Sequence, residues 1–286
     1  MKEAPKGVAP ARPFFLNADS GKRFCLYYAP LPGMECRGAF IYVHPFGDEM
    51  NKSRRMVAMQ ARALAAIGFG VLQMDLFGCG DSSGEFGDAR WNVWKQDLFV
   101  AMNWLVDKVN APVSLWGLRL GALLALDFAR SWENTIDQIV LWQPVINGES
   151  FMNQFLRLRL ANEMLAAGVD GVKATGTGTM RTQLANGETL EVAGYELAPG
   201  LTMVIDKLKA ADLAVAKSTI HWLEIVAEAG RPMPPAGAKV ISAWKQKEVD
   251  LHLHLVPCLP FWATQEISEC AGLVAATTDI FAEKRL

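Results

Sequence analysis

The 286-residue sequence has few cysteines and no block of one charge. Its five cysteines are scattered and form no C-x-x-C pair, which argues against a zinc site or a disulfide framework and predicts reduced thiols. No cluster of Lys and Arg is present to neutralise a phosphate backbone, so nucleic-acid binding is not expected. No acidic tail is present either.

Long apolar runs are also missing. A spanning helix needs ~20 predominantly apolar residues. The best candidate, residues 115–126, contains Arg119 and is followed by Asp127. Residues 1–17 mix Pro, Lys and Arg and lack the apolar core of a signal peptide. We therefore expect a cytoplasmic protein with no membrane span.

What the sequence does contain is an alternation of strand-like and helix-like segments. The hydrophobic content of 51% and net charge of -2 indicate a globular chain with a sizeable core. Short β-branched runs are separated by stretches with apolar residues at helical spacing, which predicts a mostly parallel sheet with helices on both faces. Strands are expected at 23–28, 39–43, 71–74, 113–116, 139–142, 220–226 and 249–256, and helices at 50–67, 91–109, 121–130 and near the C-terminus.

The alternation breaks between residues 147 and 217. Residues 151–167 and 201–214 are helix-like, and Asn186-Gly187 separates two strand-like runs, 182–184 and 189–192. Asn-Gly at such a position favours a type I′ hairpin turn. We therefore expect an α/β core made of residues 1–146 and 218–286, with an inserted lid or cap that carries a small β-hairpin.

Three motifs follow three of the expected strands. Residues 75–84 read D-x-x-G-x-G-x-S-x-G, residues 44–47 read H-P-F-G, and residues 117–121 read G-L-R-L-G. In this order they resemble the turn after the fourth strand, the oxyanion loop and the nucleophile elbow of the α/β-hydrolase fold. The competing interpretation of Gly78 and Gly80, a dinucleotide fingerprint, fails at position 83, which is Ser.

The elbow does not carry a nucleophile. The resemblance places the attacking Ser, Asp or Cys at the middle of G-x-x-x-G, where this sequence has Arg119. A guanidinium stays protonated and has no lone pair to offer. We expect Arg119 to keep the strained positive φ of the elbow, with Gly117 and Gly121 allowing strand and helix to approach.

The other two members of a triad are not evident. The resemblance places the histidine after the last strand, where this sequence has Phe261 and Trp262. The acid is expected near residues 227–232, where Glu228 is the nearest carboxylate. Serine-hydrolase chemistry is therefore not expected, and an unidentified nucleophile would be needed for an esterase, thioesterase or acyltransferase.

The anion-stabilising half of the site remains. The backbone N–H groups of Leu120 and Phe46 align with oxyanion-hole donors, in a loop that also contains His44 and Gly47. With Arg119 they could form a socket for an anionic metabolite. Alternatively, Arg119 forms an ion pair with an internal carboxylate, and this pair fills the former catalytic site without binding a ligand. The candidate carboxylates are Glu228, Asp48 and Glu49.

The segments W-G-L-R-L-G, H-P-F-G-D-E-M-N-K-S-R-R and P-F-W-A-T-Q-E are similar to those of one bacterial family. This is the second type of α/β-hydrolase-like protein associated with exosortase A systems. The resemblance implies a role connected to exopolysaccharide synthesis or surface-protein sorting but supplies no substrate, and we expect the ligand to be an anionic metabolite or a glycan intermediate. It implies no cofactor. The alternative is a non-enzymatic protein that docks a partner through residues 147–217.

Several further residues have two interpretations. Asp250, His252 and His254 share one face of a strand and could bind a metal, but a solvated edge strand is the favoured explanation and no metal is expected. His221 fits a buried structural histidine. Cys79 and Cys258 lie near the presumed cleft but have no sequence partner to activate them. An apolar stripe in the insertion suits packing or a lid for acyl chains; it comprises Phe151, Phe155, Leu158 and Leu165.

Overall fold

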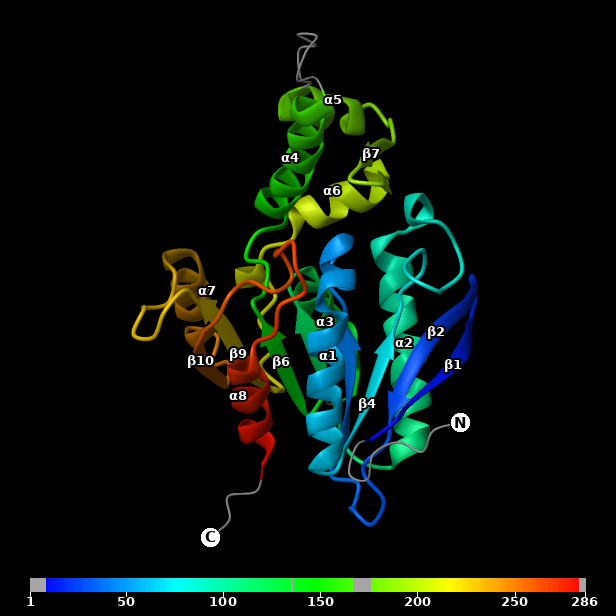
Figure 1. Cartoon of the computed structure of the whole chain (residues 1–286), viewed down its shortest axis with the longest axis vertical. Coiled ribbons are helices and arrows are strands. Elements are labelled where there is room, and N and C mark those ends of the chain that lie inside the picture. Colours follow the sequence, from blue (N-terminus) through cyan, green and yellow to red (C-terminus); the bar gives the residue numbers. More distant parts are fainter. Residues whose placement is uncertain (1–8, 135, 167–175, 283–286) are drawn as a thin grey trace.

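The computed structural model describes residues 9–134, 136–166 and 176–282. An eight-stranded sheet runs through the centre of the molecule in the order β1-β2-β4-β3-β5-β6-β9-β10 (Figure 1). β1 pairs antiparallel with β2, and β2 with β4, whereas the other neighbours are parallel. The strands are β1 (Ala11–Ala18), β2 (Gly21–Tyr28), β3 (Gly38–Val43), β4 (Phe69–Met74), β5 (Val113–Leu118), β6 (Gln138–Trp142), β9 (Thr219–Val226) and β10 (Leu251–Pro257).

Helices cover both faces of this sheet. α1 (Asp48–Ala66) and α8 (Ala271–Phe281) pack together on the face turned toward the viewer in Figure 1. The opposite face is covered by α2 (Trp91–Val109), α3 (Leu120–Ser131) and α7 (Pro235–Lys245). Burial on both sides explains why every residue of β3 and of β5 is buried. The predicted α/β-hydrolase fold, with a mostly parallel sheet between two helical layers, is confirmed.

The chain between β6 and β9 forms a separate group of elements. They are α4 (Gly148–Ala166), α5 (Thr177–Ala185), β7 (Leu190–Val192), β8 (Tyr195–Leu197), α6 (Pro199–Lys207) and a 3-10 turn (Ala210–Asp212). Figure 1 shows them stacked beyond the end of the sheet at which β6 finishes. Anything held at the carboxyl ends of the parallel strands therefore lies beneath them.

The predicted hairpin is present but in a different place. Residues 182–184 belong to helix α5, and Asn186-Gly187 ends that helix, with Gly187 at a φ of 91°. A glycine with left-handed φ commonly ends a helix, so Asn186-Gly187 ends α5 here and does not form the predicted hairpin turn. The turn between β7 and β8 is Ala193-Gly194, with φ values of 51° and 82° as a type I′ turn requires.

Other differences concern element boundaries and one missed strand. The predicted helix 201–214 is shorter, because α6 ends at Lys207 and the chain then forms a 3-10 turn. Strand β1 was not predicted; it is an edge strand whose partly exposed residues lack a clear alternating pattern. No helix within the described ranges is both long and apolar enough to cross a membrane.

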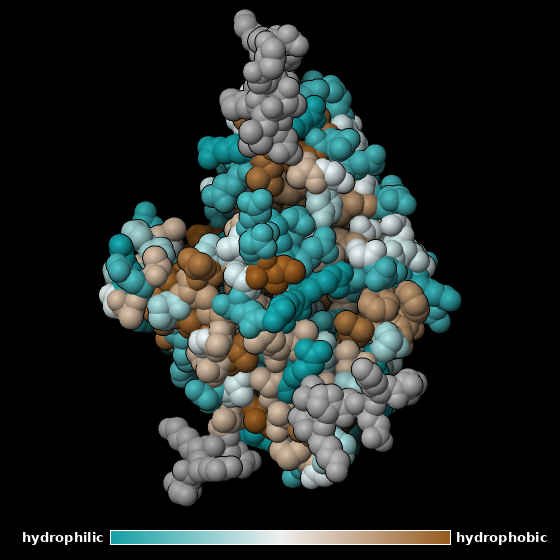
Figure 2. Space-filling view, in the orientation of Figure 1, coloured by the Kyte–Doolittle hydropathy of each residue, from teal (hydrophilic) through white to brown (hydrophobic). Residues whose placement is uncertain are grey.

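The surface shows no single broad apolar region on the face seen in Figure 2, where brown residues form separate patches among teal ones. The more exposed apolar side chains include Leu259 and Ile267, both in the loop between β10 and α8. Isolated apolar residues of this kind are ordinary for a protein surface.

Candidate functional site

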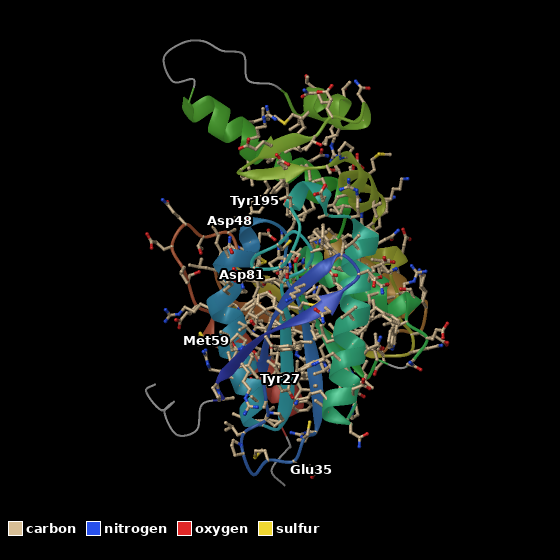
Figure 3. The ribbon with its side chains drawn as sticks, turned by 90° about the vertical axis from the view of Figure 1, so that its right-hand side faces the viewer. Tyr27, Glu35, Asp48, Met59, Asp81 and Tyr195 are labelled. Atoms are coloured by element: carbon tan, nitrogen blue, oxygen red, sulfur yellow. A yellow bond between two sulfur atoms is a disulfide. The ribbon has the colours of Figure 1, made fainter. Side chains whose placement is uncertain are left out.

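A cavity of about 690 Å³ lies between the core and the β6–β9 segment. Its walls come from the start of α1, the turn before α3, helix α4, the β7–β8 turn and the loop after β10. Figure 3 shows Asp48 of α1 and Tyr195 of β8 close together at this end of the molecule. The lining residues are Phe46, Asp48, Glu49, Lys52, Arg119, Phe151, Gln154, Phe155, Leu158, Ala193, Gly194, Tyr195, Trp262 and Ala263.

Arg119 sits on the predicted sharp turn between β5 and α3. Its φ of 55° and ψ of -118° confirm the positive-φ geometry expected of the elbow. The flanking glycines are required, because a Cβ on Gly117 would lie 2.5 Å from Ala122 Cα and one on Gly121 2.2 Å from the Val43 carbonyl oxygen. The elbow backbone is therefore kept while its central side chain is a guanidinium.

The carboxylate that meets Arg119 is Glu49. Arg119 Nε donates to Glu49 Oε1 at 3.2 Å, with the two side chains 17% and 21% exposed. Asp48 instead pairs with Lys52 at 3.1 Å. Glu228, the carboxylate nearest to the expected acid position in the sequence, instead pairs with Arg231 at the surface.

The pairing of Arg119 with Glu49 is incomplete on both sides. Glu49 Oε2 is buried and has no hydrogen-bond partner. Within the described ranges, no acceptor takes a hydrogen bond from either Nη group of Arg119. Burial raises the pKa of Glu49, and the positive charge of Arg119 opposes that rise. The pair thus leaves the Nη donors of Arg119 unused beside the cavity and one buried carboxylate oxygen of Glu49 without a partner.

Aromatic rings surround the guanidinium. The Cζ atom of Arg119 lies 5.3 Å from the ring centre of Trp262 and 6.0 Å from that of Phe151. Trp262, one of the two residues at the expected histidine position, is therefore in the cavity wall. Phe261 is fully buried and packs against Trp142 in the core, so it does not reach the site. Cation–π contacts of this kind stabilise a buried guanidinium.

One of the two thiols near the expected cleft differs from expectation. Cys258 is not free: it forms a disulfide with Cys270, at the start of α8, which corrects the expectation of reduced cysteines. Cys79 is a buried free thiol, and burial raises its pKa to about 12. Since a thiolate is the reactive form, neither sulfur is placed to act as a nucleophile.

His44 is held by the backbone. Its Nδ1 donates to the Pro45 carbonyl at 2.7 Å, and its Nε2 accepts the Leu76 N–H at 3.2 Å, which makes the ring neutral. Burial lowers the pKa of this imidazole. His44 does not line the cavity. Gly47, with a φ of 57°, begins α1, and a Cβ there would lie 3.3 Å from the Phe155 ring.

The expected oxyanion donors are only partly assembled with Arg119. Among the described residues, no acceptor is bonded to the N–H of Phe46 or of Leu120, the latter lying in the first turn of α3. Phe46 lines the cavity, but Leu120 instead lines a separate void of about 10 Å³ with His44. Phe46 lines both spaces, so it shares the cavity with Arg119 and the smaller void with Leu120.

The sequence analysis overlooked Glu224, a carboxylate within the apolar strand β9. It accepts hydrogen bonds from Trp222 Nε1 at 2.8 Å and Gln143 Nε2 at 3.1 Å. Burial raises its pKa, while these two bonds and then the charge of Arg119 oppose the rise. A single carboxylate inside an apolar strand was the available signal, since such a group needs partners in the core.

The possible metal ligands form a small histidine group at the β10 edge. His221 stacks on His252 at 5.1 Å between ring centres, and His252 lies 3.3 Å from Asp250. His221 Nε2 also bonds Gln138 Oε1 at 2.8 Å, as a buried structural histidine would. Among residues 9–134, 136–166 and 176–282, no three His, Cys, Asp or Glu side chains are arranged to hold a metal ion.

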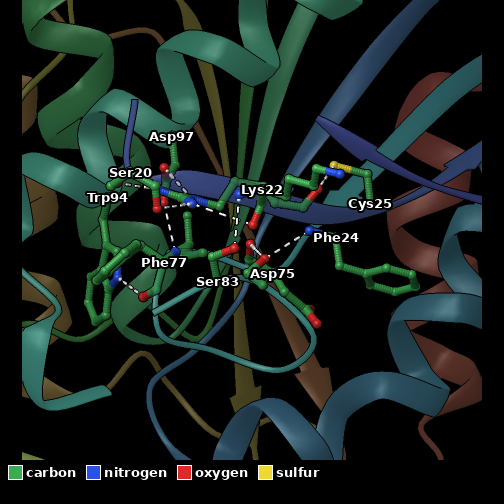
Figure 4. Close-up of polar contacts among 12 residues, drawn as sticks. Ser20, Lys22, Phe24, Cys25, Asp75, Phe77, Ser83, Trp94 and Asp97 are labelled. Atoms are coloured by element: carbon green, nitrogen blue, oxygen red, sulfur yellow. Dashed lines mark hydrogen bonds and ion pairs between the residues drawn. The ribbon is translucent and has the colours of Figure 1, made fainter. Parts of the chain in front are cut away.

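The turn after β4 is held by a dense polar network (Figure 4). Ser82 donates to the Asp75 carbonyl and accepts the Phe24 N–H, while Ser83 Oγ accepts the Lys22 N–H at 2.9 Å. Asp97 accepts the Phe77 N–H at 2.7 Å. The motif residues of this turn thus serve to fasten it to β2 and α2.

Solved structures with the same fold confirm its assignment at low sequence identity. Est1E from Butyrivibrio proteoclasticus with bound ferulic acid has a TM-score of 0.63 at 16% identity, covering 94% of this chain and 96% of that one. A soluble variant of monoglyceride lipase from Saccharomyces cerevisiae, in complex with a substrate analogue, has a TM-score of 0.63 at 14% identity, covering 96% and 94%. XC6422 from Xanthomonas campestris, an α/β serine hydrolase without a lid, has a TM-score of 0.54 at 15% identity, covering 98% and 95%.

The comparison by sequence points in the same direction. No curated protein matches this chain. The model of the family described as "Serine aminopeptidase, S33" matches residues 35–191, more than half of the 286 residues. That range includes the oxyanion loop, the turn after β4 and the elbow at Arg119. The chain is therefore a member of the serine aminopeptidase S33 family of the α/β-hydrolase superfamily.

Proposed function

We propose that this chain is a non-hydrolytic member of its family, which binds a small glycan intermediate in the central cavity. The observation that carries the proposal is the Arg119–Glu49 pair. A guanidinium occupies the elbow where a serine hydrolase holds its nucleophile, and it is paired to a carboxylate from α1. Such a residue can bind a ligand but cannot attack one.

The surroundings of Arg119 support the loss of hydrolysis. Trp262 packs beside the guanidinium from the loop after β10, where an active relative carries its histidine. In the oxyanion loop, His44 Nε2 already accepts the Leu76 N–H and is not free to act as a base. Among the described residues, these contacts support a site with no serine nucleophile at the elbow and no free histidine base beside it.

The chemistry of the cavity favours a sugar over a simple anion. Each of its two cations already contacts a carboxylate, Arg119 with Glu49 and Lys52 with Asp48, so the lining is close to neutral overall. The unused Nη groups of Arg119 offer hydrogen-bond donors to hydroxyl groups. Aromatic rings, among them Tyr195, offer flat apolar faces. An acidic metabolite remains the less favoured ligand.

The resemblance to the second exosortase A-associated type gives this proposal a biological setting. The three sequence segments that carry the resemblance all contribute to the cavity, through Arg119, through the α1 segment with Glu49, and through Trp262. We therefore place the protein in exopolysaccharide synthesis or surface-protein sorting, as a carrier or sensor of a glycan intermediate. No cofactor is required for such a role.

A thermal-shift screen tests this function. Neutral oligosaccharides, uronic acids and sugar phosphates are tested against the native chain, Arg119→Ser and Arg130→Ser. Arg130 lies exposed in the last turn of α3, so the matched control removes the same side chain away from the cavity. We expect a neutral sugar to raise the Tm of the native chain and Arg130→Ser equally, and that of Arg119→Ser much less. An unchanged response in Arg119→Ser would contradict the proposal.

A second candidate function is docking of a protein partner through residues 147–217. It is favoured by two adjacent apolar side chains on α6, Met203 and Val204, which are 51% and 38% exposed. Replacing both with Ser should weaken co-purification of such a partner without changing the ligand response of the cavity. If the double variant retains the partner, this surface does not hold it.

A further inference from the structure

A second hollow lies on the opposite helical layer from α1. It has a volume of about 500 Å³ and lies on α2, at the C-terminal end of α3 and on the residues that follow. It shares no lining residue with the cavity beside Arg119. Its lining combines three aromatic rings with four amide side chains, a composition unlike that of an ordinary charged helix surface.

The aromatic rings form one exposed cluster. Phe128 is buried at the base, and Trp132 stacks on it with 5.4 Å between ring centres and 29° between planes. Phe99 packs edge-on against Trp132 at 5.2 Å, yet remains 42% exposed. The exposed part of this ring forgoes hydrophobic stabilisation, which a flat apolar ligand face would recover. The cluster therefore offers a stacking surface.

The amides surround this cluster and have no internal role. Asn92, Gln96 and Asn103 project from α2 at spacings of four and seven residues, and Asn134 follows α3. All four are exposed, and within the described ranges none makes a hydrogen bond to the protein. Asparagine is a poor helix former because its side chain competes for backbone hydrogen bonds. No hydrogen bond among the described residues accounts for its use on this exposed helix face.

The hollow has little net charge to offer. Lys95 is paired with Asp127 at 3.1 Å, and the other charged lining residue is Glu133. A nucleic acid or an acidic ligand would find no unpaired lining cation here, and a strongly cationic one would find a single carboxylate. The complementary ligand is therefore uncharged and hydrogen-bonding.

We propose that this groove, between Phe99, Trp132 and the four amides, is a binding site for a neutral oligosaccharide. A pyranose ring presents C–H faces that stack on aromatic rings and hydroxyl groups that both donate and accept hydrogen bonds. Each amide likewise has a carbonyl acceptor and an NH₂ donor, so it matches a hydroxyl in both directions. A proline-rich peptide also docks on aromatic grooves, but its prolines supply acceptors alone.

Saturation-transfer NMR of the full chain tests the site, with maltotriose, cellotriose and xylotriose as probes and a proline-rich peptide for comparison. We expect at least one trisaccharide to bind the native chain. Trp132→Ala should weaken it about tenfold, and Asn103→Ala, which leaves the fold untouched, about two- to tenfold. Val106→Ala removes an exposed apolar residue of the same helix outside the groove and should change nothing.

Three results would overturn the proposal. They are no trisaccharide signal from the native chain, equal signals from the native chain, Trp132→Ala and Asn103→Ala, and binding of the peptide with no sugar. Arg119→Ser separates this site from the central cavity. Sugar binding lost in Arg119→Ser but kept in Trp132→Ala would assign the sugar to the cavity and refute the groove, whereas the reverse result supports the groove and leaves the cavity to its own screen.

Discussion

Two arginine–carboxylate pairs lie near the carboxyl ends of the central strands, and they differ in how completely each is satisfied. Arg23 and Asp97 are both about 1% exposed, with Nε and Oδ1 2.7 Å apart. Arg23 also donates to Ser20 Oγ at 2.8 Å, and Asp97 accepts the Phe77 N–H. Arg119 and Glu49 meet through one longer contact of 3.2 Å, and Glu49 Oε2 has no partner.

The difference separates a structural pair from a pair that a ligand could complete. Arg23 and Asp97 hold β2, the turn after β4 and α2 together (Figure 4). Each guanidinium nitrogen of Arg23 and each carboxylate oxygen of Asp97 has a hydrogen-bond partner. Arg119 and Glu49 face a cavity of about 690 Å³ with unused hydrogen-bonding groups. Buried polar groups without partners are costly, so a fold retains them where something else binds.

The largest effect is expected when the structural pair is broken. Arg23→Ala leaves the Asp97 carboxyl buried without its cation, which should lower the free energy of unfolding by about 3–5 kcal/mol at neutral pH. Urea denaturation of the native chain and the variant measures this. A loss below that of Arg119→Ser would show that the two pairs have been ranked in the wrong order.

The structural pair should also have a pH signature. Burial raises the pKa of Asp97 to about 6 from an ordinary value of 3.8, although the Phe77 N–H and Arg23 oppose the rise. The native state therefore holds its proton more tightly than the unfolded chain does. This stability is present below pH 3.8 and is lost as the pH rises to about 6, by about 3 kcal/mol.

Asp97→Asn is the variant that isolates this effect. It should be less stable than the native chain, but its stability should fall less between pH 3.8 and about 6 because the titrating group is gone. Urea denaturation at several pH values provides the comparison. Parallel stability curves for the two proteins across that range would contradict the assignment of this pH dependence to Asp97.

The cavity pair should matter less for stability. Arg119→Ser exposes Glu49 to water entering the cavity, so we expect it to lower the free energy of unfolding by about 1–2 kcal/mol. Glu49→Gln should cost less stability in the Arg119→Ser background than it costs in the native chain. A double-mutant cycle in urea measures the coupling between the two residues. Full additivity of the two single changes would mean that the 3.2 Å contact contributes nothing.

The smallest effect concerns Lys52, which pairs with Asp48 one helical turn away at 3.1 Å. Since the lysine side chain is 33% exposed and the aspartate 54%, Lys52→Ala should cost at most about 0.5 kcal/mol. Because Lys52 also lines the cavity, the variant should alter the ligand response of the thermal-shift screen. A stability loss equal to that of Arg119→Ser would remove the distinction between surface and cavity pairs.

The architecture of the core was predictable because parallel strands buried on both faces leave short apolar runs in the sequence. β3 and β5 are of this kind. The elbow geometry at Arg119 was predictable as well, since Gly117 and Gly121 have roles that a Cβ would prevent. The edge strand β1 and the helix stop at Asn186-Gly187 were not, because local residues there are compatible with more than one structure.

The candidate site was less predictable than the fold. Sequence order could propose three partners for Arg119, but the choice of Glu49 depends on how α1 packs against the elbow. Tyr195 reaches the cavity from a hairpin whose position was misjudged, and the Cys258–Cys270 disulfide joins residues on either side of the loop that carries Trp262. Such contacts between distant segments are set by tertiary packing, which periodicity does not report.

The central claim is that the elbow of this protein binds and does not attack. The most direct measurement is intact-mass and peptide analysis of the native chain after exposure to a fluorophosphonate probe, with an active serine hydrolase as positive control. The account predicts no adduct on the native chain, and none on Arg119→Ser, since a new serine there would have no histidine to activate it. A single adduct on one serine of the native chain, abolished by its mutation to Ala, would contradict the account.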